Sequence, residues 1–350
     1  MTNREPIFDV AKSVAMYCVI AGHIAAQGLV GLRTEAGREL IANFYVAVNM
    51  PTFFMIAGYF ARAAFEAGDT NKILTRVIGY FWPVLAFGCV CSVYLAMAGN
   101  VSWQQLVSFP LWLIRRLWFV RTLAIVYLVV FAIWKGCKNK WCRCVWLLFA
   151  YLCLIVNPAR LGMWYLRDVM HMFPYFVFGL LVLRQSWFKD WRIAVPCGVI
   201  YIAICLFEGD VRSNGMGFYW VSAYYKDMLL TMHGLLCFFG RTLVGISGCL
   251  FIFWLIDIAL HHVPLIGRMA TFGTTTLGIY VFHETILGKM GGHWPLPLPY
   301  NWRWLIAVLL FLFFHYFVVI LKHYRLTKFF FFGDSAFISS ALNKIRIKST

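Results

Sequence analysis

The 350-residue sequence has few charged residues and very few acids. Charged side chains make up 13% of the chain, and only 14 residues are Asp or Glu. A soluble domain is about one quarter charged, whereas here 62% of the residues are hydrophobic and 19% are aromatic. This composition excludes an ordinary soluble protein and predicts an all-α, polytopic integral membrane protein.

The sequence also lacks a disulfide framework and a standard metal-binding motif. Most of the eleven cysteines lie inside apolar runs, where cysteine behaves as a small hydrophobic residue. Cys137, Cys142 and Cys144 share a lysine-rich loop, but their C-x4-C-x-C spacing is not that of a zinc site, and no histidine is near. We therefore expect no metal. The net charge of +17 is explained by membrane topology, so no nucleic-acid partner is expected.

Apolar runs long enough to cross a bilayer recur along the chain. Clusters of glycine, proline and charge separate ten of them, at about 9–30, 42–62, 76–98, 118–134, 144–157, 168–184, 193–208, 242–260, 270–289 and 304–321. The first run has no small-residue cleavage site and is expected to be an uncleaved span. In the segment 209–241, MLLTMHGLLCFFG (Met228 to Gly240) is expected to be a half-span or a helix on the membrane surface.

Lysine and arginine predict the orientation. With the N-terminus in the cytoplasm, 19 of the 31 basic residues fall on the cytoplasmic side, and the loop KGCKNKWCR (135–143) has four cations and no acid. Ten spans then place both termini in the cytoplasm. The expected organisation is one membrane domain over 1–325 and a short basic cytoplasmic tail over 326–350, within a lipid bilayer and with the oligomeric state open.

The stretch FDVAKSVAMYCVIAGHIAAQGLV, Phe8 to Val30, is a candidate span that carries ionisable groups. Asp9 and Lys12 are three residues apart and share a helix face. His23 lies on the same face, eleven residues and about 16 Å beyond Lys12. Asp9 and Lys12 alone are equally well explained as interfacial residues that reach water. A histidine inside a span is costly and indicates function, and imidazole suits proton transfer.

The stretch NMPTFFMIAGYF, Asn49 to Phe60, contains Pro51, which interrupts the hydrogen-bond ladder of a helix. Backbone groups freed at membrane depth must be satisfied within the protein or beside a water-filled cavity. The alternative is an ordinary proline kink with a packing seam of small residues at Ala57 and Gly58. Taken alone, the stretch favours this alternative.

Two further stretches place polar side chains in apolar runs. In LWFVRTL, Arg121 falls inside the fourth span, next to Trp118 and Phe119, which could form an aromatic belt.

In the ninth span, FGTTTLGIYVFHETI carries Tyr280, His283 and Glu284. Tyr280 and His283 share a helix face. Glu284 could pair with Arg121 or with Arg241, and the sequence leaves this open.

Taken together, these stretches resemble the membrane acyltransferase family of type 3, multi-span enzymes that O-acylate cell-envelope carbohydrates. The resemblance covers about residues 5–325. In that family the first span reads Asp-x-x-(Arg or Lys), with His fourteen residues after Asp, and here these are Asp9, Lys12 and His23. The Lys form is similar to the fucose 4-O-acetylase and Nod-factor acetyltransferase-like branch.

Later elements of the family pattern also have counterparts. They are the His-Met-Pro-Leu-Phe-Phe-x-x-Ser-Gly-Tyr pattern at 49–59, a basic residue and a proline at Arg76 and Pro83, Leu-Trp-Phe at 117–119, and a Gly-x-x-Ser-x-x-Ile-Tyr-x-x-His-like element at Gly273, Thr276, Ile279, Tyr280 and His283. The chain departs from the pattern at three positions, where Asn49 replaces His, Ala57 replaces Ser and Thr276 replaces Ser. The first departure indicates a different acceptor or a weaker activity.

The resemblance implies transfer of an acyl group, most often acetyl, from acyl-CoA to a sugar hydroxyl, in the inner (plasma) membrane of a bacterium. It implies catalytic roles for His23 as general base, for Lys12, and for Asp9 in orienting Lys12. Acyl-CoA, a donor substrate and not a resident cofactor, would contact Lys12, Arg76 and Trp118.

The acceptor, a carbohydrate or a lipid-linked glycan, would contact Asn49, Arg121, Tyr280, His283 and Glu284. Tyr280 and His283 could instead stabilise the oxyanion. His171, His233 and His293 are alternative bases. A transporter or flippase of a lipid-linked sugar is the competing function, because ten spans, buried cations and a broken helix also describe transporters.

Overall fold

The computed structural model describes residues 5–26, 40–97, 104, 108, 117–156, 164–213, 232–293 and 298–333. Within these ranges, ten helices have at least 17 residues, and each corresponds to one expected span. They are α1 (Pro6–Ala26), α2 (Leu40–Glu66), α3 (Thr70–Met97), α5 (Trp118–Gly136), α6 (Lys140–Val156), α8 (Trp164–Leu181), α9 (Trp191–Ser213), α11 (Met232–His262), α14 (Thr276–His293) and α15 (Arg303–His323).

Shorter helical elements connect or follow these helices. They are η2 (Leu183–Gln185), η3 (Trp187–Lys189), α12 (Pro264–Arg268), α13 (Ala270–Gly273), η4 (Tyr300–Trp302) and α16 (Arg325–Phe332). The described residues contain no β-strand. Six of the long helices, α1, α2, α3, α5, α11 and α15, are long and apolar enough to cross a membrane. The prediction of an all-α, polytopic membrane protein is therefore confirmed, and the number of spans and the side of the termini stay predictions.

Two expected boundaries differ from the structure. Residues 232–240 are neither a half-span nor a separate surface helix, because they form the first turns of the continuous helix α11; residues 228–231 lie outside the described ranges. The expected span at 270–289 is divided into α13 and α14 by a turn at Thr274 and Thr275. Both threonine hydroxyls donate to backbone carbonyls three residues earlier, at 2.8 Å, and such bonds compete with helix continuation.

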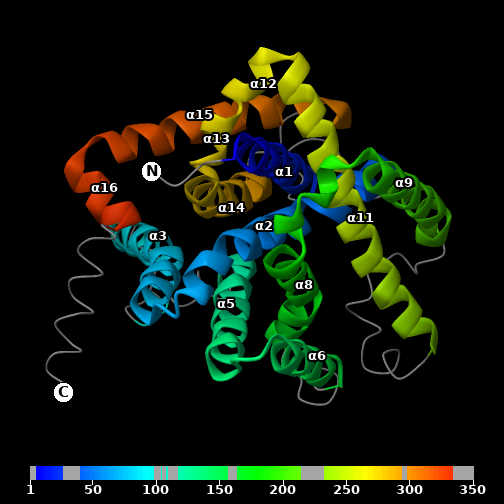
Figure 1. The fold of residues 1–350 in the computed structure, drawn as a ribbon. Helices are drawn as coiled ribbons and strands as arrows, with labels where there is room; N and C mark the ends of the chain where they lie inside the picture. The colour runs from blue at the N-terminus through cyan, green and yellow to red at the C-terminus, as the bar shows by residue number, and fades with distance from the viewer. Residues whose placement is uncertain are drawn as a thin grey trace, which may run out of the picture.

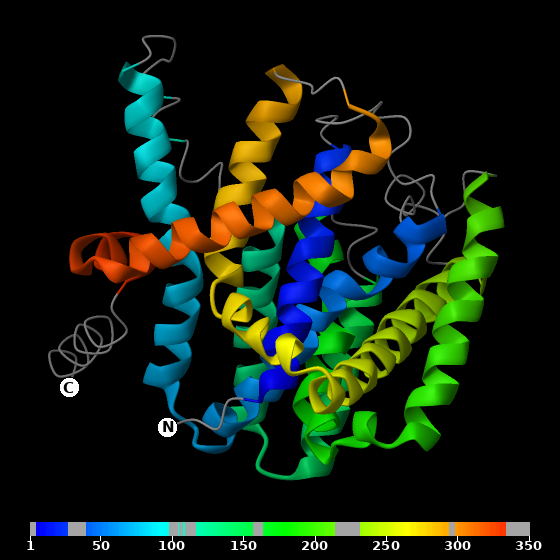
Figure 2. The same cartoon turned by 90° about the horizontal axis from the view of Figure 1, so that it is seen from above.

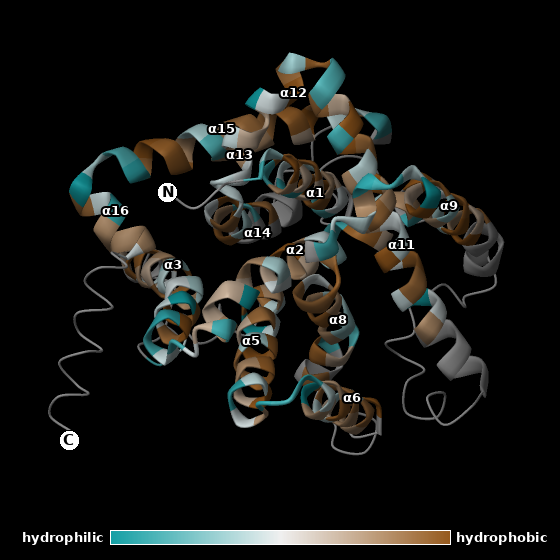
Figure 3. Cartoon of the chain, in the orientation of Figure 1, coloured by the Kyte–Doolittle hydropathy of each residue, from teal (hydrophilic) through white to brown (hydrophobic). Residues whose placement is uncertain are grey.

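Helix α1 lies in the middle of the bundle (Figure 1) and contacts α2, α11, α14 and α15. Figure 2 shows α1 and α14 standing side by side, with α15 crossing both at a steep angle. Apolar residues cover most of each helix, and hydrophilic residues gather mainly near helix ends (Figure 3). Helix α1 carries Asp9, Lys12 and His23, and ionisable residues of membrane helices face the interior of the bundle, which agrees with its central place.

The α2–α8 packing depends on two glycines. A Cβ atom on Gly58 of α2 would overlap the backbone carbonyl of Phe176 in α8, and a Cβ on Gly179 of α8 would overlap the backbone carbonyl of Met55 in α2. The two helix backbones therefore touch, as small residues allow in membrane bundles. Helix α2 passes through Pro51 as one element, which agrees with the packing-seam interpretation of this stretch.

We expect Gly58→Ala to destabilise the fold by about 1–3 kcal/mol, because the added methyl overpacks a backbone contact. The control is Gly79→Ala in α3, where an added Cβ would have no atom within 4 Å and alanine favours the helix. Thermal unfolding of the two purified variants in detergent provides the comparison. Equal midpoints for both variants would contradict the close α2–α8 contact.

Candidate active site

The ion pair between Asp9 and Lys12 forms at the start of α1. The Lys12 Nζ atom lies 2.6 Å from Asp9 Oδ1, and the two side chains are 22% and 14% exposed. They are one helical turn apart, so the pair follows from the sequence spacing. The carboxylate holds the lysine ammonium at the edge of a cavity.

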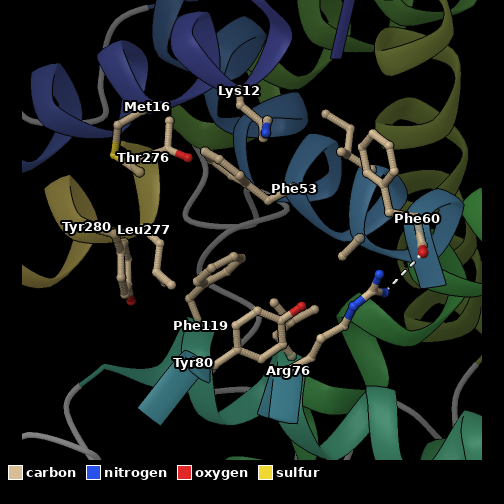
Figure 4. A pocket seen from close by; sticks show the side chains of 13 residues that line it. Lys12, Met16, Phe53, Phe60, Arg76, Tyr80, Phe119, Thr276, Leu277 and Tyr280 are labelled. Carbon is tan, nitrogen blue, oxygen red and sulfur yellow. Dashed lines mark hydrogen bonds between the residues drawn. The ribbon is translucent and has the colours of Figure 1, made fainter. Parts of the chain in front are cut away.

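This cavity has a volume of about 360 Å³ and lies among α1, α2, α3, α5 and α14. In Figure 4, Lys12 and Arg76 approach it from opposite sides, and Tyr280 lies on the side away from Arg76 and Phe60. The other lining residues are mainly apolar: Met16, Phe53, Ile56, Ala57, Tyr80, Phe119, Leu123, Thr276 and Leu277. The cavity therefore combines two cations, on opposite sides, with an otherwise mainly apolar and aromatic lining.

Arg76 is held in place by two hydrogen bonds. Its Nη1 group donates to the backbone oxygen of Phe60 at 3.0 Å and to the hydroxyl of Tyr127 at 2.7 Å. Tyr127 is fully buried, so the guanidinium has a rigid support. Because a guanidinium has five N–H donors, these two bonds leave further donors for a ligand in the cavity.

Two histidines meet beyond the Tyr280 end of the cavity. The ring centroids of His23 on α1 and His283 on α14 are 5.2 Å apart, with the rings nearly perpendicular at 86°. The Tyr280 ring, which lines the cavity, is 5.7 Å from the His283 ring. The sequence placed His23 and His283 in different spans, and the structure brings them into one pair beside the cavity.

The tautomer of His283 follows from its hydrogen bond. Its Nδ1 atom lies 2.9 Å from the backbone oxygen of Ile279. Because a carbonyl oxygen only accepts, Nδ1 carries the proton, and in the neutral ring Nε2 keeps a lone pair. His283 is fully buried, so this bond fixes both the ring orientation and its proton.

The contact between α13 and α1 explains why the histidines meet. Ser13 donates a hydrogen bond to the backbone oxygen of Met269 at 2.9 Å, and a Cβ on Gly273 would overlap the backbone carbonyl of Asp9. Helix α14 therefore begins beside the start of α1 and runs in the same direction. Its residues on the side of α1 then include Tyr280 and His283.

Other predicted site residues lie away from the cavity wall. The Arg121 guanidinium pairs with Asp168 of α8 at 3.1 Å, an acid 47 residues away that the sequence pattern did not suggest. The Oδ1 atom of Asn49 accepts a hydrogen bond from the adjacent Met50 amide at 2.6 Å. Trp118 packs on Phe119 with ring centroids 6.4 Å apart, and it is Phe119 that lines the cavity.

The remaining candidates are His171, His233, Glu284 and His293. His171 is buried in α8. The backbones of His233, Glu284 and His293 lie in α11 and α14, and their side chains lie outside the described part of the structure. The expected pairing of the Glu284 carboxylate with Arg121 or Arg241 therefore stays a prediction.

Sequence reasoning missed the apolar and aromatic residues that line the cavity. In α2, Phe53, Ala57 and Phe60 recur at intervals of three and four residues on one helix face, and all three line the cavity. That period is the signal that could have identified them. Tyr80 and Phe119 gave no comparable signal, because aromatic residues make up 19% of the chain.

Comparison with known proteins identifies one family. A family model described as an acyltransferase domain, of acyltransferase family 3, matches residues 5–323. No curated protein and no solved structure matches the chain.

The Arg121–Asp168 pair predicts a stability effect separate from catalysis. We expect Arg121→Ala and Asp168→Ala each to destabilise the protein by about 3 kcal/mol, because each leaves a mostly buried charge without its partner. The double variant Arg121→Leu/Asp168→Leu should recover much of this loss. Thermal unfolding in detergent measures all three variants, and a double variant as unstable as the sum of the two single changes would contradict the pairing.

Proposed function

Because this chain belongs to the membrane acyltransferase family whose model covers residues 5–323, we propose that it transfers an acyl group from acyl-CoA to a carbohydrate hydroxyl. Acetyl is the proposed acyl group, and a cell-envelope or exported glycan is the proposed acceptor. The observation that carries the proposal is one cavity that is lined by the cations Lys12 and Arg76 and also by Tyr280, whose ring lies beside the histidine pair. The family match gives no support to a transporter or flippase.

The two cations that line the cavity suit the phosphates of coenzyme A. Lys12 provides a point charge, which is a common phosphate ligand, and Arg76 provides a planar fork of donors. Both groups are held by protein partners, at Asp9 for the lysine and at Tyr127 for the arginine. This support lowers the entropy that a bound phosphate must remove from them. Lysine and arginine residues in the loops on the predicted cytoplasmic side favour an opening of the cavity toward the cytoplasm. Acyl-CoA would enter through this opening.

The apolar part of the cavity suits the pantetheine arm and the thioester. Met16, about one turn after Lys12 on α1, and Leu277, about one turn before Tyr280 on α14, contribute to this apolar lining. A thioester that follows this path arrives beside Tyr280, whose ring lies next to the ring of His283. The acyl carbon would then be near the histidine pair, which is where a nucleophile has to be activated.

In the proposed reaction, His23 accepts the proton of the acceptor hydroxyl. The hydroxyl oxygen attacks the thioester carbonyl carbon, and the tetrahedral oxyanion is stabilised by the phenol of Tyr280 as donor. The C–S bond then breaks, the new ester C–O bond remains, and the thiolate of CoA takes the proton from His23. His283, whose proton is fixed on Nδ1, positions the His23 ring through the contact between the two rings.

The acceptor would reach the histidine pair from the side away from Lys12 and Arg76. Arg121 is a weaker candidate for acceptor binding than the sequence suggested, because its guanidinium is paired with Asp168. Asn49 stands where the related pattern has histidine, and its amide oxygen is used by the local Met50 amide. The assignment of this chain to the fucose 4-O-acetylase and Nod-factor acetyltransferase-like branch stays a prediction.

We expect His23→Ala to lower O-acyl transfer by about 10²–10⁴-fold, the usual contribution of general base catalysis. The measurement is the O-acetyl content of envelope polysaccharide in cells that carry wild type or variant, with protein level checked by immunoblot. The control is His262→Ala, a change of an exposed histidine at the end of α11. Unchanged acetylation at a normal protein level would refute the role of His23.

A second prediction concerns the donor site. Lys12→Ala should raise the apparent KM for acetyl-CoA by about 10-fold or more, with a smaller effect on kcat, because a charge-assisted bond to phosphate is lost. Lys12→Arg should restore part of the affinity, and Lys72→Ala, at an exposed lysine of α3, serves as the matched control. Steady-state kinetics in proteoliposomes would measure the KM for acetyl-CoA and the kcat of each variant. A fall in kcat at unchanged KM would count against phosphate binding.

A further inference from the structure

A cluster of rings around Phe119 forms the part of the cavity wall next to Tyr280, which we call the end wall. The Phe119 ring is 5.5 Å from Phe53 and 5.1 Å from Tyr280, measured between ring centroids. Phe54, behind the cavity wall, lies 5.4 Å from the same ring. Phe119 is therefore in contact with three aromatic rings from α2 and α14.

These contacts make the end wall rigid. Phe119 and Phe53 are 7% and 8% exposed, and Phe54 is fully buried. A ring held among several packed side chains cannot turn aside without opening a void, which costs dispersion energy. Met16 of α1, which is 2% exposed, also lines the cavity. Phe119 and Met16 are thus two buried, apolar members of the cavity lining.

The direction of a bound donor places the acyl chain against this wall. The phosphates lie at Lys12 and Arg76, and the thioester carbonyl lies near Tyr280, as proposed above. Carbon atoms beyond the carbonyl must then fit between Tyr280, Met16 and Phe119, because all three line the same cavity. A short acyl group fits without moving the wall, whereas each added methylene has to displace a packed side chain.

We propose that Phe119 and Met16 select short acyl groups by closing the acyl end of the cavity. The proposal rests on the proposed function, because it requires acyl-CoA as the donor. Neither residue has a polar group to offer the reaction, so each acts on specificity through volume alone. The proposal also gives a role to the Leu-Trp-Phe stretch, in which Phe119 is the residue that lines the cavity.

The test measures acyl-CoA binding to the purified full-length protein in nanodiscs. Radiolabelled acetyl-CoA is displaced by unlabelled acetyl-CoA, butanoyl-CoA or hexanoyl-CoA, so no acceptor is needed. In the wild type, the longer chains should bind more weakly than acetyl. In Phe119→Ala and Met16→Ala, the ratio of hexanoyl-CoA affinity to acetyl-CoA affinity should rise by about 10-fold or more, because the extra methylenes gain an apolar space.

The matched control is Phe131→Ala. Phe131 lies on the same helix α5 and is also 7% exposed, but its ring packs on Phe65 at 5.3 Å and is not part of the cavity wall. This variant should lose similar packing and keep the wild-type ratio. Phe119→Leu, a milder change, gives the same readout if Phe119→Ala does not yield folded protein.

The outcomes separate the two proposals. If wild-type protein binds no acyl-CoA, the proposed function fails, and the length selection fails with it. If wild type binds acetyl-CoA, the donor site stands and the ratio decides the inference alone. Equal affinity of wild type for acetyl-CoA and hexanoyl-CoA, or ratios in the Phe119 and Met16 variants equal to that of Phe131→Ala, would overturn it.

Discussion

The contact between the short helix α13 and the first turns of α1 is the constraint on which the site depends. Gly273 has no side chain and lets the backbones touch at Asp9, and Ser13 donates a hydrogen bond across the same contact. Because this contact places the start of α14 beside the start of α1, the two helices run together. Without this contact His23 would lose its neighbour His283, and the cavity would lose the side that α14 forms.

The membrane setting explains how the cations are arranged. A charge inside a bilayer needs a partner, and the described structure provides one for each cation discussed here. Lys12 pairs with Asp9, Arg121 pairs with Asp168, and Arg76 is bonded to Tyr127. Lys12 and Arg76 line a cavity as well, whereas Arg121 serves to join α5 and α8. Of these two arginines, only Arg76 therefore adjoins the cavity.

Aromatic residues perform two tasks in this bundle. They pack helices together, as in the cluster of Phe8 with Tyr59 and Phe253, and they form the rigid apolar part of the cavity. The second task needs only a few rings held by others, of which Phe119 is the central one. A site built this way has little freedom to adapt to ligands of different size.

The sequence alone determined the helices and one face of the site. Apolar runs specify membrane helices, and the helical period places Asp9, Lys12 and His23 on one side of α1, because these features depend only on neighbouring residues. Only the tertiary structure decided that His283 meets His23, that Asp168 pairs with Arg121, and that Phe119 lines the cavity. These contacts join residues far apart in the chain, as Ser13 and Met269 show at a separation of 256. Such contacts depend on how packed helices align, which no local period records.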